Sequence, residues 1–394
     1  MEKMDHMDNW LLYILVVVAI GIGWWLRGRE GIKQADTLGP NYYNGINYLL
    51  NEDPDRAVAA FIEELDVNQD TLETHLALGG LLRRRGELEK AVIVHENILA
   101  HARLEKEDML NVKLELARDY LLAGLLDRAE ELSVTLSHEK GKTLRESRKI
   151  TLEVYELEKE WHQAIEVAQL LAVGDDTEKY EKAISHYYCE IASDHLTGRN
   201  HEAARGAISE AIGHDASNAR ATLIHGKIDI AEGHYEDSIN TLTRIRDQEH
   251  VYVPESLNTL SEAYEKAALP KEDLCEYLES CLQITPSISI VLTLATVKRE
   301  QMGDEAMAKF IANHLKRNPT IRGLTQLIDL HVDNTSGVAK QNLTILRSFA
   351  EALVADKPAY RCHACGFELK KMAWHCPSCR DWATVKPIFG LEGE

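Results

Sequence analysis

The sequence has few aromatic residues and few prolines. Aromatic side chains make up 6% of the 394 residues, and only nine prolines occur along the whole chain. Leu, Ala, Glu and Lys are abundant and favour helices, while the scarcity of proline leaves long stretches in which a helix can continue. This composition disfavours a protein built mainly of strands. A chain of this length and apolar content predicts a mostly helical protein of two or more domains.

Positive charge is also scarce. The chain carries 44 Lys and Arg against 64 Asp and Glu, which gives a formal net charge of -20 at pH 7. Most of such a surface repels a phosphate backbone, so a general nucleic-acid binder is excluded and no nucleic-acid partner is expected. The partners of this chain are therefore predicted to be proteins.

Catalytic motifs are missing as well. The segments His201–Arg205 and His138–Lys142 begin like the HExxH of zinc proteases, but Arg and Lys stand where the second His is needed. Gly21–Gly23 lies inside a hydrophobic run and is no nucleotide fingerprint, and the sequence contains no GxxxxGK[ST] loop. The seventeen His residues are scattered through predicted helices. The sequence therefore predicts a protein that is not an enzyme and has no catalytic residues.

One long hydrophobic run is present near the start. Trp10–Leu26 holds 17 residues without a charge, which makes a helix of roughly 26 Å, close to the thickness of a bilayer core of about 30 Å. Trp residues stand at both ends, as in interfacial aromatic belts. A signal peptide is the alternative, but it needs a basic start and a small-residue cleavage site, whereas residues 1–9 are acidic. The run is predicted to be a retained transmembrane helix.

The charges that flank this run predict its orientation. Arg27, Arg29 and Lys33 follow it directly, while the residues before it carry net negative charge. The positive-inside rule then places the bulk of the chain on the cytoplasmic side of the cell inner membrane, with a single pass. Because thiols stay reduced in the cytoplasm, the cysteines are predicted to bind metal or to remain free. Cys189, Cys275 and Cys281 fall in helical apolar patterns and are expected to be packing residues.

Between residues 41 and 356 the sequence repeats. A small or apolar residue is followed twelve positions later by another, and successive first positions are 34, 38, 35, 40 and 34 residues apart. A period near 34 is typical of tetratricopeptide (TPR) repeats, in which small residues let paired helices approach closely. Eight or nine repeats are expected, and the groove of such a solenoid favours an adaptor that binds peptides or helices. The pairs are Gly45 and Ala57, Gly79 and Ala91, Ala117 and Ala129, Leu152 and Ala164, Ala192 and Ala204, Gly226 and Ser238, and Ala295 and Met307.

The strongest chemical signal is at the other end of the chain. Cys362 and Cys365 form one CxxC pair, and Cys376 and Cys379 form a second after ten intervening residues. Two such pairs are typical of four thiolates around one tetrahedral metal ion, with tight turns of the rubredoxin or zinc-ribbon type. Four Cys ligands leave no open position for water or substrate, so the site is predicted to be structural. The spacing does not separate iron from zinc, and one divalent ion of either kind is expected.

The segment around these cysteines is locally basic. Residues 357–389 contain six Lys and Arg against two Asp and Glu, so the segment is still about +2 when four thiolates and one divalent ion are counted. Two interpretations stay open at this point. In one, the segment docks onto its acidic neighbour. In the other, it offers a basic, aromatic surface to an outside partner through residues such as Trp374, Trp382, Lys370 and Lys371, and the two are compatible with each other.

These features predict an all-α fold with five segments. It is a TPR helical-repeat solenoid with one N-terminal transmembrane helix and a small C-terminal rubredoxin-like or zinc-ribbon module. The segments are a short acidic periplasmic N-terminus (1–9), the transmembrane helix (10–26), a juxtamembrane linker (27–40), the TPR solenoid (41–356) and the metal-binding module (357–394).

The C-terminal sequence resembles a known family. The runs Tyr360–Phe367 and Trp374–Arg380, with the Lys-Pro-Ile that starts at Lys386, closely resemble the rubredoxin-like module of the lipopolysaccharide assembly protein B family. His75–Glu87 (HLALGGLLRRRGE) and His186–Ala192 (HYYCEIA) resemble the same family. That family also combines one inner-membrane helix with cytoplasmic TPR units, so the resemblance extends over the whole chain. It implies that the four cysteines are the metal ligands.

The resemblance implies regulation rather than catalysis. Proteins of this family promote destruction of the committed-step lipid A deacetylase by the membrane AAA+ protease FtsH, and they are linked to other lipopolysaccharide-synthesis and regulatory membrane proteins. The implied function is an inner-membrane adaptor that modulates lipopolysaccharide levels and binds its partners through the TPR groove and the metal module. Two alternatives stay open: a scaffold that assembles lipopolysaccharide-synthesis enzymes without controlling their turnover, and an iron redox protein.

The predicted topology can be tested with a reporter that is active only in the periplasm. Fused after Glu394, the reporter should be inactive, because the positive-inside rule keeps that end in the cytoplasm. The same reporter joined before Met1 is the control and should be active. An active fusion after Glu394 would show that the orientation is the reverse.

Overall fold

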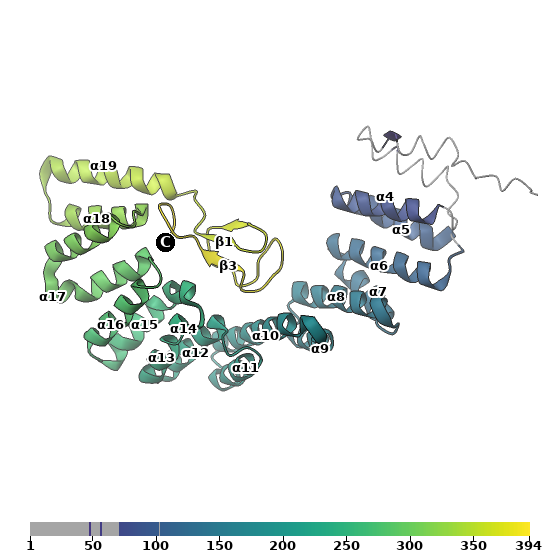
Figure 1. Cartoon of the computed structure of the whole chain (residues 1–394), viewed down its shortest axis with the longest axis horizontal. Helices are drawn as coiled ribbons and strands as arrows, with labels where there is room; N and C mark the ends of the chain where they lie inside the picture. Colours follow the sequence, from purple (N-terminus) through teal and green to yellow (C-terminus); the bar gives the residue numbers. More distant parts are fainter. Residues whose placement is uncertain (1–46, 49–55, 57–70, 102) are drawn as a thin grey trace, which may run out of the picture. The chain divides into compact units, whose positions relative to one another are not determined.

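Figure 1 shows the computed structural model of the chain, which describes residues 47, 48, 56, 71–101 and 103–394. The predicted N-terminus, transmembrane helix and linker, together with most of the first predicted repeat, lie outside the described residues. Within the described ranges, no helix is both long enough and apolar enough to cross a membrane. The chain divides into two compact units, residues 1–150 and 151–394.

The first unit consists of helices that pack in consecutive pairs. In α4 the buried residues recur every three or four positions (Leu72, His75, Leu78, Gly79 and Leu82), which is the spacing of one helix face. That face packs against α5, and α6 packs against α7 in the same way. Among the residues of this unit that the structure describes, the helices are α4 (Leu72–Arg84), α5 (Leu88–His101), α6 (Lys106–Leu122), α7 (Leu126–Leu136) and the first part of α8 (Gly141–Glu158).

The second unit continues this pairing and ends in a small sheet. Two short 3-10 turns, η1 (Gly174–Asp176) and η2 (His250–Tyr252), lie among its helices. The helices after α8 are α9 (Trp161–Leu171), α10 (Thr177–Thr197), α11 (His201–His214), α12 (Ala219–Glu232), α13 (Tyr235–Leu242), α14 (Ile245–Glu249), α15 (Val253–Ala267), α16 (Lys271–Leu282), α17 (Ile288–Leu315), α18 (Ile321–Asp333) and α19 (Gly337–Val354). The turn η1 and the 21-residue helix α10 account for the repeat spacing of 40.

The small-residue pairs predicted from the repeat lie where paired helices touch. The Ser238 hydroxyl donates a hydrogen bond of 2.8 Å to the Gly226 carbonyl, twelve residues away, and both residues are buried. A Cβ atom added at Gly226 would lie 2.6 Å from Cγ of Leu242, so only glycine fits at this approach. The structure therefore confirms a mostly helical, TPR-like solenoid over the described residues. Fully buried alanines of other pairs are Ala91, Ala117, Ala129, Ala164, Ala192 and Ala204.

Two turns show how the helices end. Gly303 has φ 72° and ψ 168° and breaks α17 into two arms, as expected for a turn between paired helices. Glycine tolerates this conformation because it has no Cβ. Gly198, predicted as a turn residue, does lie between α10 and α11, but its φ is -75°, and the left-handed position is taken by Arg199 at φ 58°. The positions of the glycines therefore did not show which residue of this turn adopts the left-handed conformation.

The C-terminal module is a three-stranded antiparallel sheet with long loops. Its strands are β1 (Tyr360–Cys362), β2 (Glu368–Leu369) and β3 (Val385–Pro387), in the order β2-β1-β3. Tyr360 pairs with Leu369 on one side and with Pro387 on the other. Figure 1 shows this module inside the curve of the helices of the second unit. We call the helix surface that it contacts the inner face, formed by the end of α8 and by α10, α12, α14, α15, the first arm of α17, and α18.

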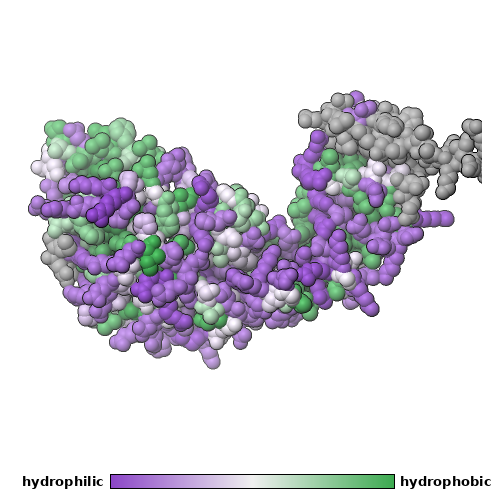
Figure 2. Space-filling model, viewed as in Figure 1, coloured by the Kyte–Doolittle hydropathy of each residue, from purple (hydrophilic) through white to green (hydrophobic). Residues whose placement is uncertain are grey.

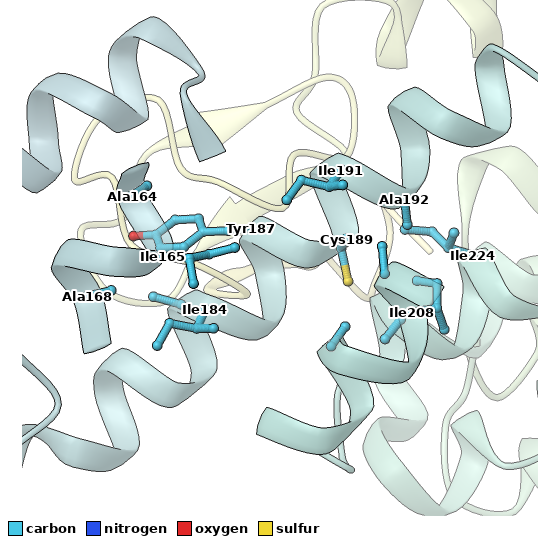
Figure 3. Close-up of a cluster of buried hydrophobic side chains, with 14 of the residues drawn as sticks. Ala164, Ile165, Ala168, Ile184, Tyr187, Cys189, Ile191, Ala192, Ile208 and Ile224 are labelled. Atoms are coloured by element: carbon cyan, nitrogen blue, oxygen red, sulfur yellow. The ribbon is translucent and has the colours of Figure 1, made fainter. Parts of the chain in front are cut away.

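The largest hydrophobic cluster of the second unit lies where α9, α10 and α11 meet (Figure 3). Tyr187 and Ile184 point from α10 toward Ala164, Ile165 and Ala168 of α9 (Figure 3). Trp382 of the module also packs against this cluster. The cluster is therefore shared between the solenoid and the metal module.

The free cysteines agree with the packing role expected for them. Cys189 lies within this cluster and is fully buried, and Cys281 is also buried. Burial away from water raises the pKa of Cys189 to about 12, because the thiolate form is desolvated. Neither thiol has the exposure or the lowered pKa that a nucleophile needs.

Two glycine substitutions test the close approach of paired helices. Gly226→Ala should lower the stability of the second unit by about 1–3 kcal/mol, because the new methyl group overlaps Leu242. Gly206→Ala, at an exposed helix position with no atom within 4 Å of the added Cβ, should instead stabilise by about 0.5–1 kcal/mol. Thermal unfolding of the purified full chain, followed by circular dichroism, measures both. Equal shifts for the two variants would contradict the proposed packing.

Candidate metal centre and its seat on the solenoid

Two turns of similar geometry carry the four cysteines. In the first, the Gly366 amide donates to the Cys362 carbonyl at 2.9 Å, and Gly366 has φ 79°. In the second, the Arg380 amide donates to the Cys376 carbonyl at 2.9 Å, and Arg380 has φ 58°. Both turns therefore place a left-handed residue four positions after the first cysteine of the pair. The sequence pointed to Gly366 in this role, whereas nothing in the sequence marked Arg380.

The two turns bring all four thiols to one point. The sulfur atoms of Cys362, Cys365, Cys376 and Cys379 all lie within 4.8 Å of one another. Sγ of Cys362 is 3.6 Å from Sγ of Cys379, and the corresponding distance from Cys365 to Cys376 is 3.8 Å. A tetrahedron with metal–sulfur bonds of about 2.3 Å has edges of about 3.8 Å, so these distances fit one tetrahedral ion. They are too long for disulfides, whose S–S bond is about 2.05 Å.

The electrostatics of the cluster also fit a cation. Burial disfavours the thiolate of Cys362, but a hydrogen bond with the Thr384 hydroxyl and the amides of Ala364 and Cys365 lower its pKa to about 6. Burial and the three neighbouring thiols raise the pKa of Cys379 to about 12. Four thiolates this close repel one another, and a divalent ion of iron or zinc removes that repulsion. The four thiolates would close the ligand shell of such an ion, whose role would be to hold the module together.

The module docks on the inner face through polar contacts at its edge. Arg380 forms an ion pair of 2.9 Å with Glu153 of α8, and Lys386 pairs with Glu249 of α14. The Tyr360 hydroxyl donates to Glu255 of α15 at 2.7 Å. Docking on an acidic neighbour, one of the two interpretations left open by the sequence, is therefore what the structure shows. These ion pairs are partly exposed, and pairs of this kind contribute only ~0–1 kcal/mol each.

Aromatic rings form the centre of the contact. Trp382 stacks on His375 of the module, with ring centroids 4.3 Å apart, and on His186 of α10 at 5.1 Å. Its indole nitrogen donates to Glu156 of α8 at 3.0 Å. Aromatic pairs contribute ~0.5–1.5 kcal/mol each beyond the area that they bury, so the stack outweighs the exposed ion pairs.

A second tryptophan extends this contact to α15. The ring of Trp374 lies 4.8 Å from that of Tyr252, at the start of α15. The Tyr252 hydroxyl reaches into the module, where the carbonyls of Ala383 and Val385 accept hydrogen bonds from it at 3.0 Å. The structure thus uses both tryptophans to attach the module to the solenoid. Of the two lysines named with them, Lys370 pairs with Asp356.

His186 is neutral in this setting. Desolvation by burial, together with the positive charge of Arg220 and the neighbouring His375, lowers its pKa to about 3. The folded-state pKa lies below the unfolded value near 6.5, so protonation of His186 opposes docking as the pH falls below 6.5. At neutral pH the ring stacks on Trp382 without charge.

The last residues of the chain tie the module to two further helices. The Glu394 carboxylate accepts hydrogen bonds from the hydroxyls of Ser287 and Ser289, at the N-terminus of α17, and forms an ion pair of 2.6 Å with Arg322 of α18. The Leu391 carbonyl accepts from the amide of Ile321 at 2.8 Å. Sequence reasoning missed this attachment, because Ser, Arg and Glu at such distances in the chain carry no recognisable spacing.

A second group of potential ligands has a simpler explanation. Asp229, Glu232 and His234 lie close together at the end of α12. Arg205 of α11 forms ion pairs with both carboxylates, so their charge is already balanced by a guanidinium. Within the described residues, the four cysteines are therefore the better candidate for a metal.

Comparison with known proteins agrees with these observations. A family model described as the rubredoxin metal binding domain matches residues 360–387. Lipopolysaccharide assembly protein B of Escherichia coli (strain K12) is 35% identical over 390 residues, which cover 97% of this chain and 99% of that protein. The chain belongs to the lipopolysaccharide assembly protein B family. The lipopolysaccharide assembly protein B of Haemophilus influenzae is 28% identical and covers 97% of this chain and 99% of its own length.

Solved TPR structures resemble parts of this member of the lipopolysaccharide assembly protein B family. A thermophilic TPR protein from Thermus thermophilus is 19% identical and covers 57% of this chain and 98% of its own, with a TM-score of 0.21. The TPR2AB domain of yeast Sti1 is 15% identical and covers 58% and 97%, with a TM-score of 0.23. At these TM-scores the superposition carries no weight. The helix pairs and their small-residue contacts define the TPR-like fold.

Replacing one predicted ligand tests the metal centre. Cys379→Ser should release the metal and unfold the module, because a small sheet with a minimal core depends on the ion. Trp374 and Trp382 should then become solvated, which shifts tryptophan fluorescence to the red, while far-UV circular dichroism changes little. Metal content follows from mass spectrometry of the purified chain. Cys275→Ser, at a half-buried helix position outside the cluster, is the control and should keep the metal.

Two results would contradict this expectation. Full metal content in Cys379→Ser would show that Cys379 is not a ligand. Loss of most helical signal would show that the solenoid of the second unit does not fold without its module.

Proposed function

We propose that this protein is a non-catalytic adaptor of the inner membrane that lowers lipopolysaccharide synthesis. In this role it brings the committed-step lipid A deacetylase to the membrane AAA+ protease FtsH. Membership of the lipopolysaccharide assembly protein B family supports the pathway. The predicted anchor at residues 10–26 supports a single-pass location with the bulk of the chain in the cytoplasm, close to a membrane-bound protease.

The observation that supports an adaptor most directly is the seating of the metal module. Its metal ligands form a closed set, and its aromatic residues pack against α10 and α15. Ion pairs at Glu153 and Glu249 surround this contact. The polar and aromatic groups at this place thus stabilise an assembly of two parts of one chain. The module is thus held in a fixed position on the solenoid, which suits an adaptor.

The seated module also restricts where partners bind. On the second unit, the inner face that TPR proteins use for peptides is occupied from α8 to α18 by the module and the tail that ends at Glu394. The outward side of the module remains open, where Phe367 and Lys371 are exposed beside the first cysteine turn. We infer that this outward side is one of the surfaces that meet the protease, the deacetylase or another lipopolysaccharide-synthesis or regulatory membrane protein.

A scaffold without effect on turnover is the second candidate, and one experiment separates the two. Depleting the protein in cells should lengthen the half-life of the deacetylase several-fold, as measured by pulse-chase. In cells whose FtsH is catalytically inactive, depletion should leave the half-life unchanged. An unaltered half-life in cells with active FtsH would favour the scaffold.

The module can be tested in the same cells. Cys379→Ser should fail to restore rapid turnover, because the module no longer folds on the inner face. Phe367→Asp changes only an exposed side chain, so the variant should keep its metal and its fluorescence while turnover slows. Normal turnover with Phe367→Asp would place the partner surface elsewhere.

A further inference from the structure

The last helix of the solenoid carries an apolar stripe. On α19, five large apolar side chains are more than half exposed, although the helix also has a side that packs against α18. Figure 2 shows the hydrophobic surface over this helix at the upper left. We define the α19 stripe as Val338 (72% exposed), Ile345 (51%), Leu346 (55%), Phe349 (64%) and Leu353 (64%).

The stripe occupies one face of α19. With 3.6 residues per turn, its five side chains fall within an arc of about 100° and extend over about 22 Å. The side that faces α18 is a different one: Arg347 forms an ion pair of 2.7 Å with Asp329 of α18, and Ala350 is buried. The stripe is therefore centred on a different side of α19 from the contact with α18. The two sides meet where Leu346 lies one helical turn from Ala350.

A solenoid buries each repeat against the next, and its terminal repeat needs a polar outer face to remain soluble. After Val354 the chain does not add a further helix but turns into strand β1, which begins at Tyr360. In the part of the chain that the structure describes, the stripe stays exposed to solvent. A contiguous apolar face of this kind indicates a protein interface.

The charges on α19 restrict what can cover the stripe. Lys340, Arg347 and Glu351 are its charged residues, and all three project from the half of the helix that faces away from the stripe. An uncharged face on a chain of net charge -20 does not attract an anionic lipid surface, and it offers nothing to a charged peptide. The matching partner is another apolar helix face.

The stripe has an approximate two-fold repeat along its length. Ile345 and Leu346 stand at its centre, with Val338 at one end and Leu353 at the other, so these four positions exchange under a two-fold rotation. The same rotation sets Phe349 of one copy against Asn342 of the other. We propose that α19 pairs antiparallel with the α19 of a second copy of this chain about a two-fold axis near Ile345. Such a pairing places the Val338 end of one stripe against the Leu353 end of the other, which is an isologous contact.

The area of the stripe is sufficient for a modest dimer. Side chains of this size and exposure present about 500 Å² on each copy, or about 1,000 Å² in total, which is near the lower limit for a specific interface. Ala339 and Ala352 flank the stripe and are small enough to let two helices approach closely. The pairing goes beyond the proposed adaptor function and does not depend on it.

Sedimentation of the purified full chain in detergent tests the pairing. The unaltered chain should form a dimer as its concentration rises, and Phe349→Glu should weaken the dimer at least tenfold, because a carboxylate would be buried in the contact. Phe349 is exposed in the single chain, so its replacement should leave the circular dichroism unchanged. Thr344→Glu adds the same charge to α19 outside the stripe and is the matched control, which should dimerise normally.

Crosslinking tests the two-fold axis. Under mild oxidation, Ile345→Cys should give a disulfide-linked species of twice the chain mass, whereas Thr344→Cys should not. A chain that stays monomeric at every concentration would overturn the proposal. So would a dimer that Phe349→Glu leaves unchanged, or a crosslink from Ile345→Cys to a different protein.

Discussion

The convergence of four thiolates from two short turns is the constraint on which the metal module and its seat on the solenoid depend. The module has only three short strands and a core of Cys362, Cys376 and Val385, with a few partly buried neighbours. Too little apolar surface is buried there to offset the loss of backbone entropy over some thirty residues. A divalent ion held by the four thiolates would supply the missing free energy and would fix the loops that present Trp374 and Trp382.

The contact between module and solenoid has the same distribution of aromatic and charged residues as a protein–protein interface. Aromatic rings occupy its centre, and the exposed ion pairs of Arg380 and Lys386 form its rim. In such interfaces the buried aromatic anchors carry most of the binding free energy, whereas rim charges mainly fix orientation. The inner face that other TPR proteins keep open for a ligand is thus filled from within the same chain.

Much of this arrangement follows from local patterns, and the rest does not. The period near 34 and the small residues such as Gly226 follow from how closely two helices can pack, so they were predictable. The four cysteines were predictable because metal geometry fixes their spacing. The left-handed turn at Arg380 and the inward direction of Trp382 depend on contacts more than two hundred residues away, as with Glu153. Such contacts leave no periodicity in a single sequence. The basic charge of the module was compatible both with docking on the acidic solenoid and with a surface exposed to an outside partner.

The separation along the chain between docking partners has a consequence for folding. A TPR solenoid assembles from neighbouring repeats, so its helices can form in order as the chain is synthesised. The pairs of Arg380 with Glu153 and of Lys386 with Glu249 cannot form until the C-terminal residues have left the ribosome. Until then the inner face, with His186 and Tyr252, is open and partly apolar. Docking of the module is therefore a late step in folding, which joins residues far apart in the sequence after the C-terminal segment has been synthesised.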